Sequence, residues 1–174
     1  MALPKYVALG HVSGGGFDLT GTNTNEIVEA SQTDTSVIAL GNGNDTLFAG
    51  DVDSSFLGNG TNTYYGARDS NVTAGTGVDT FIYGSGTKSQ SLSTLGTQTI
   101  LNYDTAKDTV QIAKNLVTAQ QLLQDFKHAT HYAPTDTNGG EWYVPLDEGH
   151  GIDIVSKTGS DPSRQELQKT FKLV

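Results

Sequence analysis

Apolar residues recur at a nearly constant interval along the first half of the chain. All but the first follow a cluster of Gly, Asn, Asp, Ser or Thr, and successive members lie 8 to 10 positions apart. Helix faces recur every ~3.6 residues and strand faces every ~2, so this interval predicts one short strand plus one turn, repeated. The residues expected to point inward are Val7, Phe17, Ile27, Val37, Leu47, Phe56, Tyr64, Val72 and Phe81.

Every second interval is also similar in sequence. Segments 40–48, 57–65 and 74–82 share a Gly-x-Gly loop followed by Asp or Asn, Thr and an apolar residue, and each lies 17 residues after the last. A two-strand coil of about 17 to 20 residues explains both periods, with alternate strands stacked in two sheets. We therefore expect a mainly β protein, a parallel β-roll or β-solenoid of short strands over residues 1–84.

These three segments resemble the nonapeptide G-G-x-G-x-D-x-U-x of the repeats-in-toxin family of calcium-binding parallel β-rolls. Glycines allow loop conformations that leave carbonyl groups pointing at a cation, and the Asp adds the carboxylate that a hard cation prefers. The resemblance implies calcium (Ca²⁺) as the bound ion. The implied binding residues are Asn25, Gly41, Gly43, Asp45, Gly58, Gly60, Asn62, Gly75, Gly77 and Asp79.

The chain departs from this pattern at both edges of the predicted roll. Asn replaces Asp on alternate turns, so any calcium site should be weak, with a dissociation constant of ~10⁻⁴ to 10⁻³ M. The alternative is a ladder of Asn and Asp turns that bonds its own loops without metal. On the opposite edge, Asp34, Asp53 and Asp69 are expected to form a carboxylate ladder, which either binds calcium or serves as exposed solubilising charge.

Residues 85–174 lack the nine-residue interval and are expected to cap the roll, packed with it as a single unit. Thr118 is expected to cap the first helix, and Asp161 with Pro162 to begin a second. The predicted elements are strands at 99–103 and 108–112, a helix at 117–129, and a hairpin of 141–145 with 151–155. The apolar face of the first helix is expected to contain Leu122, Leu123 and Phe126.

The order of these elements also resembles the C-terminal region of repeats-in-toxin proteins. The matching segments are 79–81, 100–104, 108–112 and 171–174, although Lys172 stands where an acidic residue is common. The resemblance implies an uncleaved C-terminal signal for type I secretion machinery, and therefore a secreted, extracellular protein. The apolar patch around Tyr6 has fewer residues than the apolar core of a signal peptide needs.

Charge and composition narrow the possible partners. The formal net charge is −9 and no basic cluster is present, which argues against nucleic acid and anionic membranes as partners. No apolar stretch is long enough to predict a membrane span. The chain has no cysteine, which excludes disulfides and thiolate metal sites.

Enzyme motifs are absent from the sequence: there is no HExxH, GxSxG, Walker loop or cysteine nucleophile. A zinc site could be imagined from His128, His131 and His150, but solvent-facing histidines are the simpler interpretation. The carboxylate pairs Asp51/Asp53 and Asp147/Glu148 lack the cleft that a glycosidase needs. We therefore expect a protein that is not an enzyme by itself.

One predicted outer face suggests a binding surface. Its expected members are Val28, Phe48, Tyr65 and Ile82, flanked by Thr46, Thr63 and Thr80. The helix at 118–128 or the hairpin could cover this face, or it could bind an extended polysaccharide whose repeats match the rungs. Our leading hypothesis is a non-catalytic calcium-binding module that mediates polysaccharide or matrix binding, as in the accessory modules of polysaccharide-modifying enzymes. The alternatives are a self-associating adhesion or surface-layer protein, and an enzyme with a site in residues 85–174.

Overall fold

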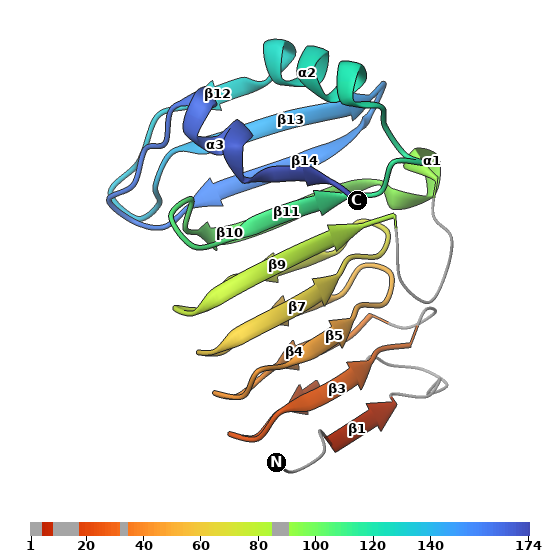
Figure 1. The fold of residues 1–174 in the computed structure, drawn as a ribbon. Helices are drawn as coiled ribbons and strands as arrows, with labels where there is room; N and C mark the ends of the chain where they lie inside the picture. Colours follow the sequence, from red (N-terminus) through yellow and green to blue (C-terminus); the bar gives the residue numbers. More distant parts are fainter. Residues whose placement is uncertain (1–4, 9–17, 32–34, 85–90) are drawn as a thin grey trace.

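The protein consists mainly of short β-strands with a few short helices (Figure 1). The computed structural model describes residues 5–8, 18–31, 35–84 and 91–174. The first sheet contains, in spatial order, β1 (Lys5–Ala8), β3 (Glu26–Glu29), β5 (Thr46–Phe48), β7 (Thr61–Tyr65), β9 (Val78–Tyr83), β11 (Thr109–Ile112) and β15 (Phe171–Leu173). The second contains β2 (Asp18–Thr20), β4 (Val37–Ala39), β6 (Ser54–Phe56), β8 (Asn71–Thr73), β10 (Thr97–Tyr103), β14 (His150–Ser156), β13 (Glu141–Asp147) and β12 (Thr130–Tyr132).

The chain passes alternately from one sheet to the other from β1 to β11, so the expectation that alternate strands stack in separate sheets is confirmed. Strand pairing is parallel throughout the first sheet. It is parallel in the second sheet from β2 to β14, and the β13–β14 hairpin then adds antiparallel strands that end at β12. The strands predicted near 99–103 and 108–112 are present as β10 and β11, which extend the two sheets.

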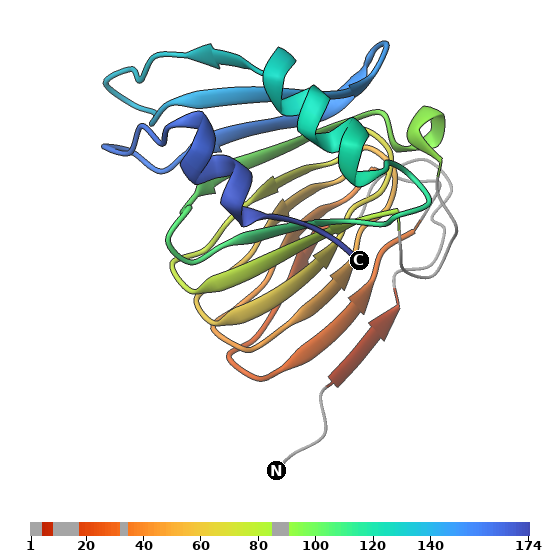
Figure 2. The same cartoon turned by 45° about the horizontal axis from the view of Figure 1, so that its top comes forward.

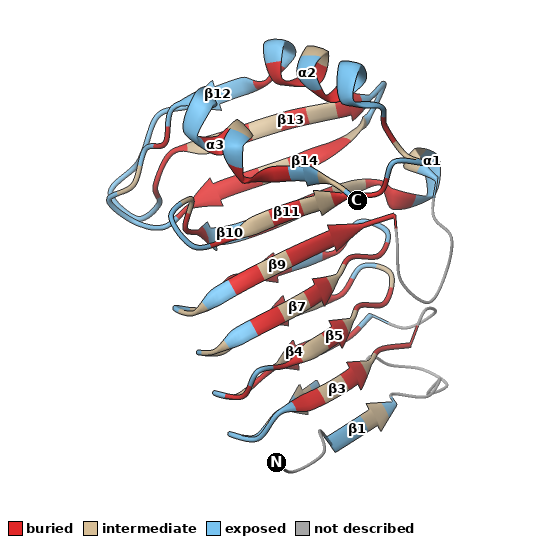
Figure 3. Cartoon of the chain, viewed as in Figure 1, coloured by how far each residue is buried: buried red, intermediate tan, exposed pale blue. Residues whose placement is uncertain are grey.

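A row of fully buried side chains runs along the inner face of the first sheet (Figure 3). Val28 pairs with Leu47, Leu47 with Tyr64, and Tyr64 with Phe81, at spacings of 19, 17 and 17 residues. The expectation that Ile27 points inward is wrong, because its neighbour Val28 occupies the buried row. Since side chains alternate along a strand, this one-residue difference exchanges the two faces of β3.

The second sheet contains a similar correction. Ile38, Ser55 and Val72 form its buried row, whereas Val37 and Phe56 are 44% and 47% exposed. The interval alone could not distinguish the members of the Val37-Ile38 pair. At β6, pairing with both neighbouring strands places the small Ser55 inside in spite of the more apolar Phe56. Phe17, also expected inside, lies outside the described residues.

Aromatic rings fill much of the space between the sheets. Tyr64 and Phe81 have ring centroids 6.1 Å apart, and Phe81 lies 6.0 Å from Tyr103 on β10. The buried hydroxyl of Tyr64 donates a hydrogen bond of 2.8 Å to Ser70 Oγ. Tilted ring pairs at such distances stabilise a fold by more than their buried apolar area alone. The hydroxyl of Tyr64 is thus satisfied inside the core.

Helix α2 (Ala119–His128) closes the C-terminal end of the stack (Figure 2). As predicted, Thr118 is its N-cap and accepts a hydrogen bond from the Gln121 N–H. Leu122 and Phe126 are buried, and the Phe126 ring meets Phe171 of β15 edge to face at 4.8 Å. The assignment of Leu123 to this face is wrong, since it is 53% exposed. Residues four apart share a helix face, whereas Leu123 lies further around the helix.

Helix α3 (Arg164–Thr170) begins later than predicted. Ser163, not Asp161, is the N-cap, and it forms a capping box with Glu166. Asp161 instead pairs with His131, with 2.7 Å between Oδ1 and Nε2. A third helix, α1 (Leu92–Leu95), was not predicted. Among the helices of the described ranges, none is long and apolar enough to cross a membrane.

The register of β4 can be tested with two adjacent substitutions. Ile38→Ala should lower the free energy of unfolding by about 2–5 kcal/mol, because it empties a fully buried position. Val37→Ala should change the same quantity by less than ~0.5 kcal/mol, because Val37 lies on the outer face. Urea unfolding of both variants measures the difference. Equal losses, or a larger loss at Val37, would contradict this register.

Candidate functional site

One edge of the first sheet carries a buried row of acidic and amide side chains, which we name the acidic ladder. Each member lies two residues before an inward side chain, where a loop enters its strand. The members are Glu26, Asp45, Asn62, Asp79 and Asp108, whose exposed fractions are 2%, 1%, 1%, 0% and 3%. Buried polar groups of this kind require hydrogen-bond partners.

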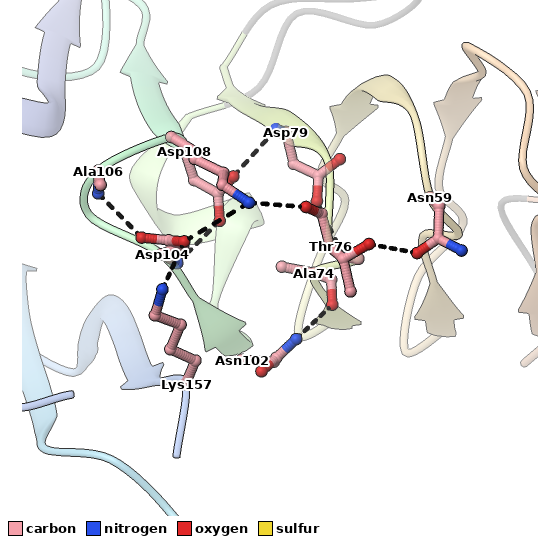
Figure 4. Close-up of polar contacts among 11 residues, drawn as sticks. Asn59, Ala74, Thr76, Asp79, Asn102, Asp104, Ala106, Asp108 and Lys157 are labelled. Carbon is pink, nitrogen blue, oxygen red and sulfur yellow. Dashed lines mark hydrogen bonds and ion pairs between the residues drawn. The ribbon is translucent and has the colours of Figure 1, made fainter. Parts of the chain in front are cut away.

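Backbone N–H groups of neighbouring turns supply the first set of partners. Glu26 N donates to Asp45 Oδ1 at 2.8 Å, and Asp45 N donates to Asn62 Oδ1 at 3.1 Å. The pattern continues with Asp79 N, which donates to Asp108 Oδ1 at 3.0 Å (Figure 4). Asn62 also donates from Nδ2 to Asp79 Oδ1 at 2.9 Å. Each turn is thereby tied to the next through a side-chain oxygen.

The second carboxylate oxygen usually closes its own loop. It accepts a hydrogen bond from the backbone N–H four residues earlier, at 2.9 to 3.1 Å, in the pairs Thr22–Glu26, Gly75–Asp79 and Asp104–Asp108. Asp45 is the exception, because its Oδ2 is buried and has no hydrogen-bond partner among the described groups. A buried, unsatisfied carboxylate oxygen is costly. Asp45 is therefore the position in the ladder that most needs a further ligand.

Burial makes the ladder electrostatically unfavourable as a row of charges. Desolvation raises the pKa of Asp45, and the neighbouring Glu26 carboxylate raises it further, against the lowering effect of the Glu26 N–H. Desolvation likewise raises the pKa of Asp79. For Asp108, desolvation together with repulsion from Asp79 and Asp104 raises the pKa to about 6, although two backbone N–H groups oppose the shift. Binding of protons or cations would reduce this charge repulsion and desolvation cost.

The structure brings together most of the residues predicted for this edge. Asp45, Asn62 and Asp79 share one row, but Asn25 does not, and its expected place is occupied by Glu26. This error follows from choosing Ile27 as the inward residue. Asn25 belongs to an exposed neighbouring row, where its Oδ1 accepts a hydrogen bond of 3.0 Å from Asn44 N.

Sequence reasoning missed Glu26 and Asp108 as members of the ladder. A signal for Asp108 was available, because Asp or Asn, then Thr, then an apolar residue recurs at 45–47, 62–64, 79–81 and 108–110. No such signal identifies Glu26, because Ile27 follows it in place of Thr. Only the pairing of β3 with β5 places Glu26 beside Asp45.

The six predicted loop glycines lie in this edge, in two columns that follow the stack. A Cβ atom on Gly58 would lie 1.6 Å from the carbonyl oxygen of Gly41, and one on Gly77 would lie 1.6 Å from that of Gly60. Close approach of successive loops therefore explains these glycines without a metal ion. The columns contain Gly41, Gly58 and Gly75, and Gly43, Gly60 and Gly77.

The carboxylate ladder predicted for the opposite edge is wrong. Asp53 is fully buried, and its carboxylate accepts hydrogen bonds from Ser36 N at 2.7 Å and Gly50 N at 2.6 Å. Asp69 is exposed and lies one row away, since the register of β6 with β8 aligns Asp53 with Ser70. The misassignment of Phe56 as inward displaced this prediction by one residue. Asp34 lies outside the described residues.

The outer face of the first sheet carries the predicted threonine row. Thr46 pairs with Thr63 and Thr63 with Thr80, and all three are half-buried. Beside them, the rings of Phe48 and Tyr65 stack in parallel with centroids 4.5 Å apart.

Two parts of that prediction need revision. Val28 is wrong as a member of this face, because it points into the core, and Ile82 is in register but only 9% exposed. The suggested cover is also not seen in the described part of the chain. Helix α2 packs on β13, and no described helix or hairpin lies over β5 and β7 (Figure 1).

The remaining titratable side chains do not converge. Within the described ranges, no three His, Asp or Glu side chains form a group that could hold a metal ion. His131 pairs with Asp161 and stacks on Trp142 with centroids 4.6 Å apart. His150 pairs separately with Asp147. These histidines hold neighbouring segments of the cap together rather than form a shared site.

The buried carboxyls make stability depend on pH with a defined sign. Desolvation raises the pKa values of Asp53, Asp108 and Asp153 to about 6. The folded protein therefore binds more protons than the unfolded chain between about pH 4 and pH 6, and its stability should fall as pH rises through this window. Thermal unfolding in a metal chelator should show a midpoint several degrees higher near pH 4.5 than near pH 7.

Asp53→Asn provides the matched control for this pH profile. The two carboxylate oxygens of Asp53 each accept a hydrogen bond from a backbone N–H. In the Asn variant an NH₂ group would face one of these N–H groups, so the substitution should lower the free energy of unfolding. It should also flatten the slope between about pH 4 and pH 6, because one group with a raised pKa is removed. A profile of unchanged slope, or a wild-type midpoint that rises with pH, would refute this assignment.

Comparison with known proteins gives no family assignment. Family models, curated proteins and solved structures were each searched, and none matches this chain.

Proposed function

We propose that the chain is a secreted, non-catalytic parallel β-roll module that binds calcium at the acidic ladder and contacts extracellular polysaccharide through the outer face of its first sheet. The alternation of short parallel strands between two sheets supports the β-roll assignment. The buried carboxylates of the ladder support the calcium-binding assignment. Calcium would stabilise the fold after export through the type I route.

The unpartnered Oδ2 of Asp45 is the observation that carries the calcium proposal. A buried carboxylate oxygen that has no donor among the described groups fits the preference of calcium for oxygen ligands. The Glu26 carboxylate on the neighbouring turn adds negative charge beside Asp45. The residues that would hold the ion are Asp45, Glu26 and backbone carbonyls of the loops that contain Gly41 and Gly43.

The composition of this site predicts weak binding. Because no three acidic side chains converge within the described ranges, backbone carbonyls would have to complete the ligand set. Sites with few carboxylates have dissociation constants of ~10⁻⁴ to 10⁻³ M and fill only where calcium is abundant. Weak affinity therefore agrees with a protein that folds outside the cell.

The stacked aromatic pair supports the polysaccharide contact. Phe48 and Tyr65 present half-buried rings on a parallel sheet, next to the hydroxyls of Thr46, Thr63 and Thr80. Rungs repeat every ~4.8 Å along this face. The outward ring edges of this stacked pair and the regularly spaced hydroxyls match an extended polymer that alternates apolar patches with hydroxyl groups. The proposal therefore assigns ligand contact to this face and calcium to the loop edge.

Calcium should raise the unfolding temperature of the wild-type chain near pH 7. At about 10 mM calcium, a site with a dissociation constant of ~10⁻³ M would stabilise the fold by about 1.4 kcal/mol, which corresponds to ~3–6 °C. Differential scanning calorimetry in chelator and in calcium measures the shift. The shift should vanish in Asp45→Asn, which keeps Oδ1 as the acceptor for Glu26 N but removes the charge.

Asp136→Asn is the charge-matched control, because Asp136 is exposed and distant in sequence from the ladder. It should retain the full calcium shift. If the wild-type midpoint is the same in chelator and in calcium, the calcium part of the proposal is wrong. If Asp45→Asn keeps the shift, the ion binds elsewhere.

Substitution of the aromatic pair tests the polysaccharide contact. The double variant Phe48→Ala/Tyr65→Ala should lose retention on insoluble or immobilised polysaccharides, because it removes both ring faces from the sheet. Phe56→Ala, which removes an exposed ring from the second sheet, is the control and should bind as the wild type does. Affinity electrophoresis across a panel of neutral and acidic polysaccharides measures retention. Binding unchanged in the double variant would rule out this face.

A further inference from the structure

Two lysines supply positive charge at the last turn of the acidic ladder, and one of them, Lys157, points toward Asp104 (Figure 4). Lys107 Nζ donates a hydrogen bond of 2.9 Å to the carbonyl oxygen of Thr76, in the loop one turn earlier. The same Nζ lies 4.0 Å from Asp104 Oδ2, and Lys157 Nζ lies 2.7 Å from that oxygen. Two ammonium groups thus lie at the loop that ends in Asp108.

This loop also differs in sequence from the loops before it. The register of β11 with β9 places Asp104 where the preceding turn has Gly75, and Ala106 where it has Gly77. The Asp104 side chain accepts a hydrogen bond of 3.0 Å from Ala106 N, and its carbonyl accepts one of 2.8 Å from Asp108 N. The last loop therefore closes on itself and contains a carboxylate that the glycine-containing loops lack.

The two ends of the ladder are neutralised unequally. At the C-terminal end, burial acts to raise the pKa of Asp104, but Lys157 and Lys107 hold it below its usual value, and Lys107 offsets a small part of the rise that burial causes at Asp79. At the N-terminal end, Glu26 is approached only by Lys5 among the described cations, at 3.8 Å, and the Lys5 side chain is 61% exposed. The orphaned oxygen of Asp45 lies at this less compensated end.

We propose that Lys107 and Lys157 are a built-in counter-ion for the last turn of the ladder, in the role that a bound cation would fill, and that exchangeable cation binding is confined to the Glu26–Asp45 turn. The first half of this proposal stands on the lysine contacts alone, whereas the second half rests on the proposed calcium function. The ladder would then have one end that folds without metal and one end that responds to it.

The charge balance at the lysine-bearing end involves a small set of groups. Asp79 comes from β9, Asp108 and the two lysines flank β11 and β14, and Tyr103 of β10 donates from its hydroxyl to the Asp108 carbonyl oxygen at 3.1 Å. Removing the ammonium groups leaves three carboxylates uncompensated. Their titration then determines how the loss varies with pH. The facing groups are Asp79, Asp104, Asp108, Lys107, Lys157 and Tyr103.

Lys107→Met and Lys157→Met, singly and together, test the counter-ion. In chelator near pH 7, the double variant should unfold about 3–8 °C below the wild type, because the buried carboxylates lose their neutralising charge. At pH 3 the loss should be smaller, because Asp104, whose pKa the lysines lower, becomes protonated as pH falls through its folded pKa. Lys114→Met, at an exposed lysine beyond β11, is the control and should lose nothing at either pH.

A loss that is equal at both pH values would show that the lysines act only through packing and would overturn the counter-ion role. A loss no larger than that of Lys114→Met would do the same. The single variants protect the test if the double variant does not fold, since each lysine side chain is 47% exposed and should tolerate replacement.

Isothermal titration calorimetry with calcium chloride tests whether cation binding is confined to the Glu26 and Asp45 turns. Glu26→Gln should weaken calcium binding about tenfold, whereas Lys107→Met should leave the wild-type site intact and add binding at the vacated end. Unchanged affinity in Glu26→Gln would overturn confinement to the first turn. If the wild-type chain binds no calcium, both the proposed calcium function and the confinement of cation binding to the first turn are wrong. The unfolding measurements at two pH values would still decide the counter-ion role of the lysines.

Discussion

Backbone N–H groups at one edge of the first sheet depend on side-chain oxygens from the next turn. Glu26 N, Asp45 N and Asp79 N each donate to the ladder residue that follows, so successive turns are joined by polar bonds inside the edge as well as by the strand pairs. Without these acceptors the loops would bury unpaired donors, which few folded proteins tolerate. The spacing and close stacking of the loops, including the tight glycine contacts, follow from this requirement.

The same arrangement concentrates negative charge where water is excluded. A carboxylate accepts two N–H groups well, but the row that results contains four acids with side chains no more than 3% exposed. Asn62 interrupts the row with a neutral side chain, and Lys107 with Lys157 supplies positive charge at one end. The uncompensated Asp45 turn is the remaining place where a proton or a cation would be most effective. Fold stability and the proposed cation binding therefore concern the same carboxylates.

The repeat was readable from sequence because its period is set by chain geometry. Strand plus turn recurs near nine residues, and the pairing of Leu47 with Tyr64 and Tyr64 with Phe81 at 17 residues agrees with that interval. The face of each strand was less certain, since adjacent apolar residues such as Ile27 and Val28 satisfy the interval equally. Each wrong choice shifted the associated polar residue by one position. The prediction therefore placed Asn25 in the ladder where the structure has Glu26, and it aligned Asp53 with Asp69 where the structure aligns Asp53 with Ser70.

The sequence by itself determined the mainly β architecture, the alternation of strands between two sheets, and the membership of Asp45, Asn62 and Asp79 in one row, because these depend on local periodicity. The tertiary structure decided which neighbour of each apolar pair is buried, because cross-strand pairing and the opposing sheet settle the register. It alone placed Glu26 in the ladder, left the second oxygen of Asp45 without a partner among the described residues, and brought Lys157 to Asp104 from 53 residues away. Contacts between residues so distant along the chain leave no local pattern, so only the folded chain reveals them.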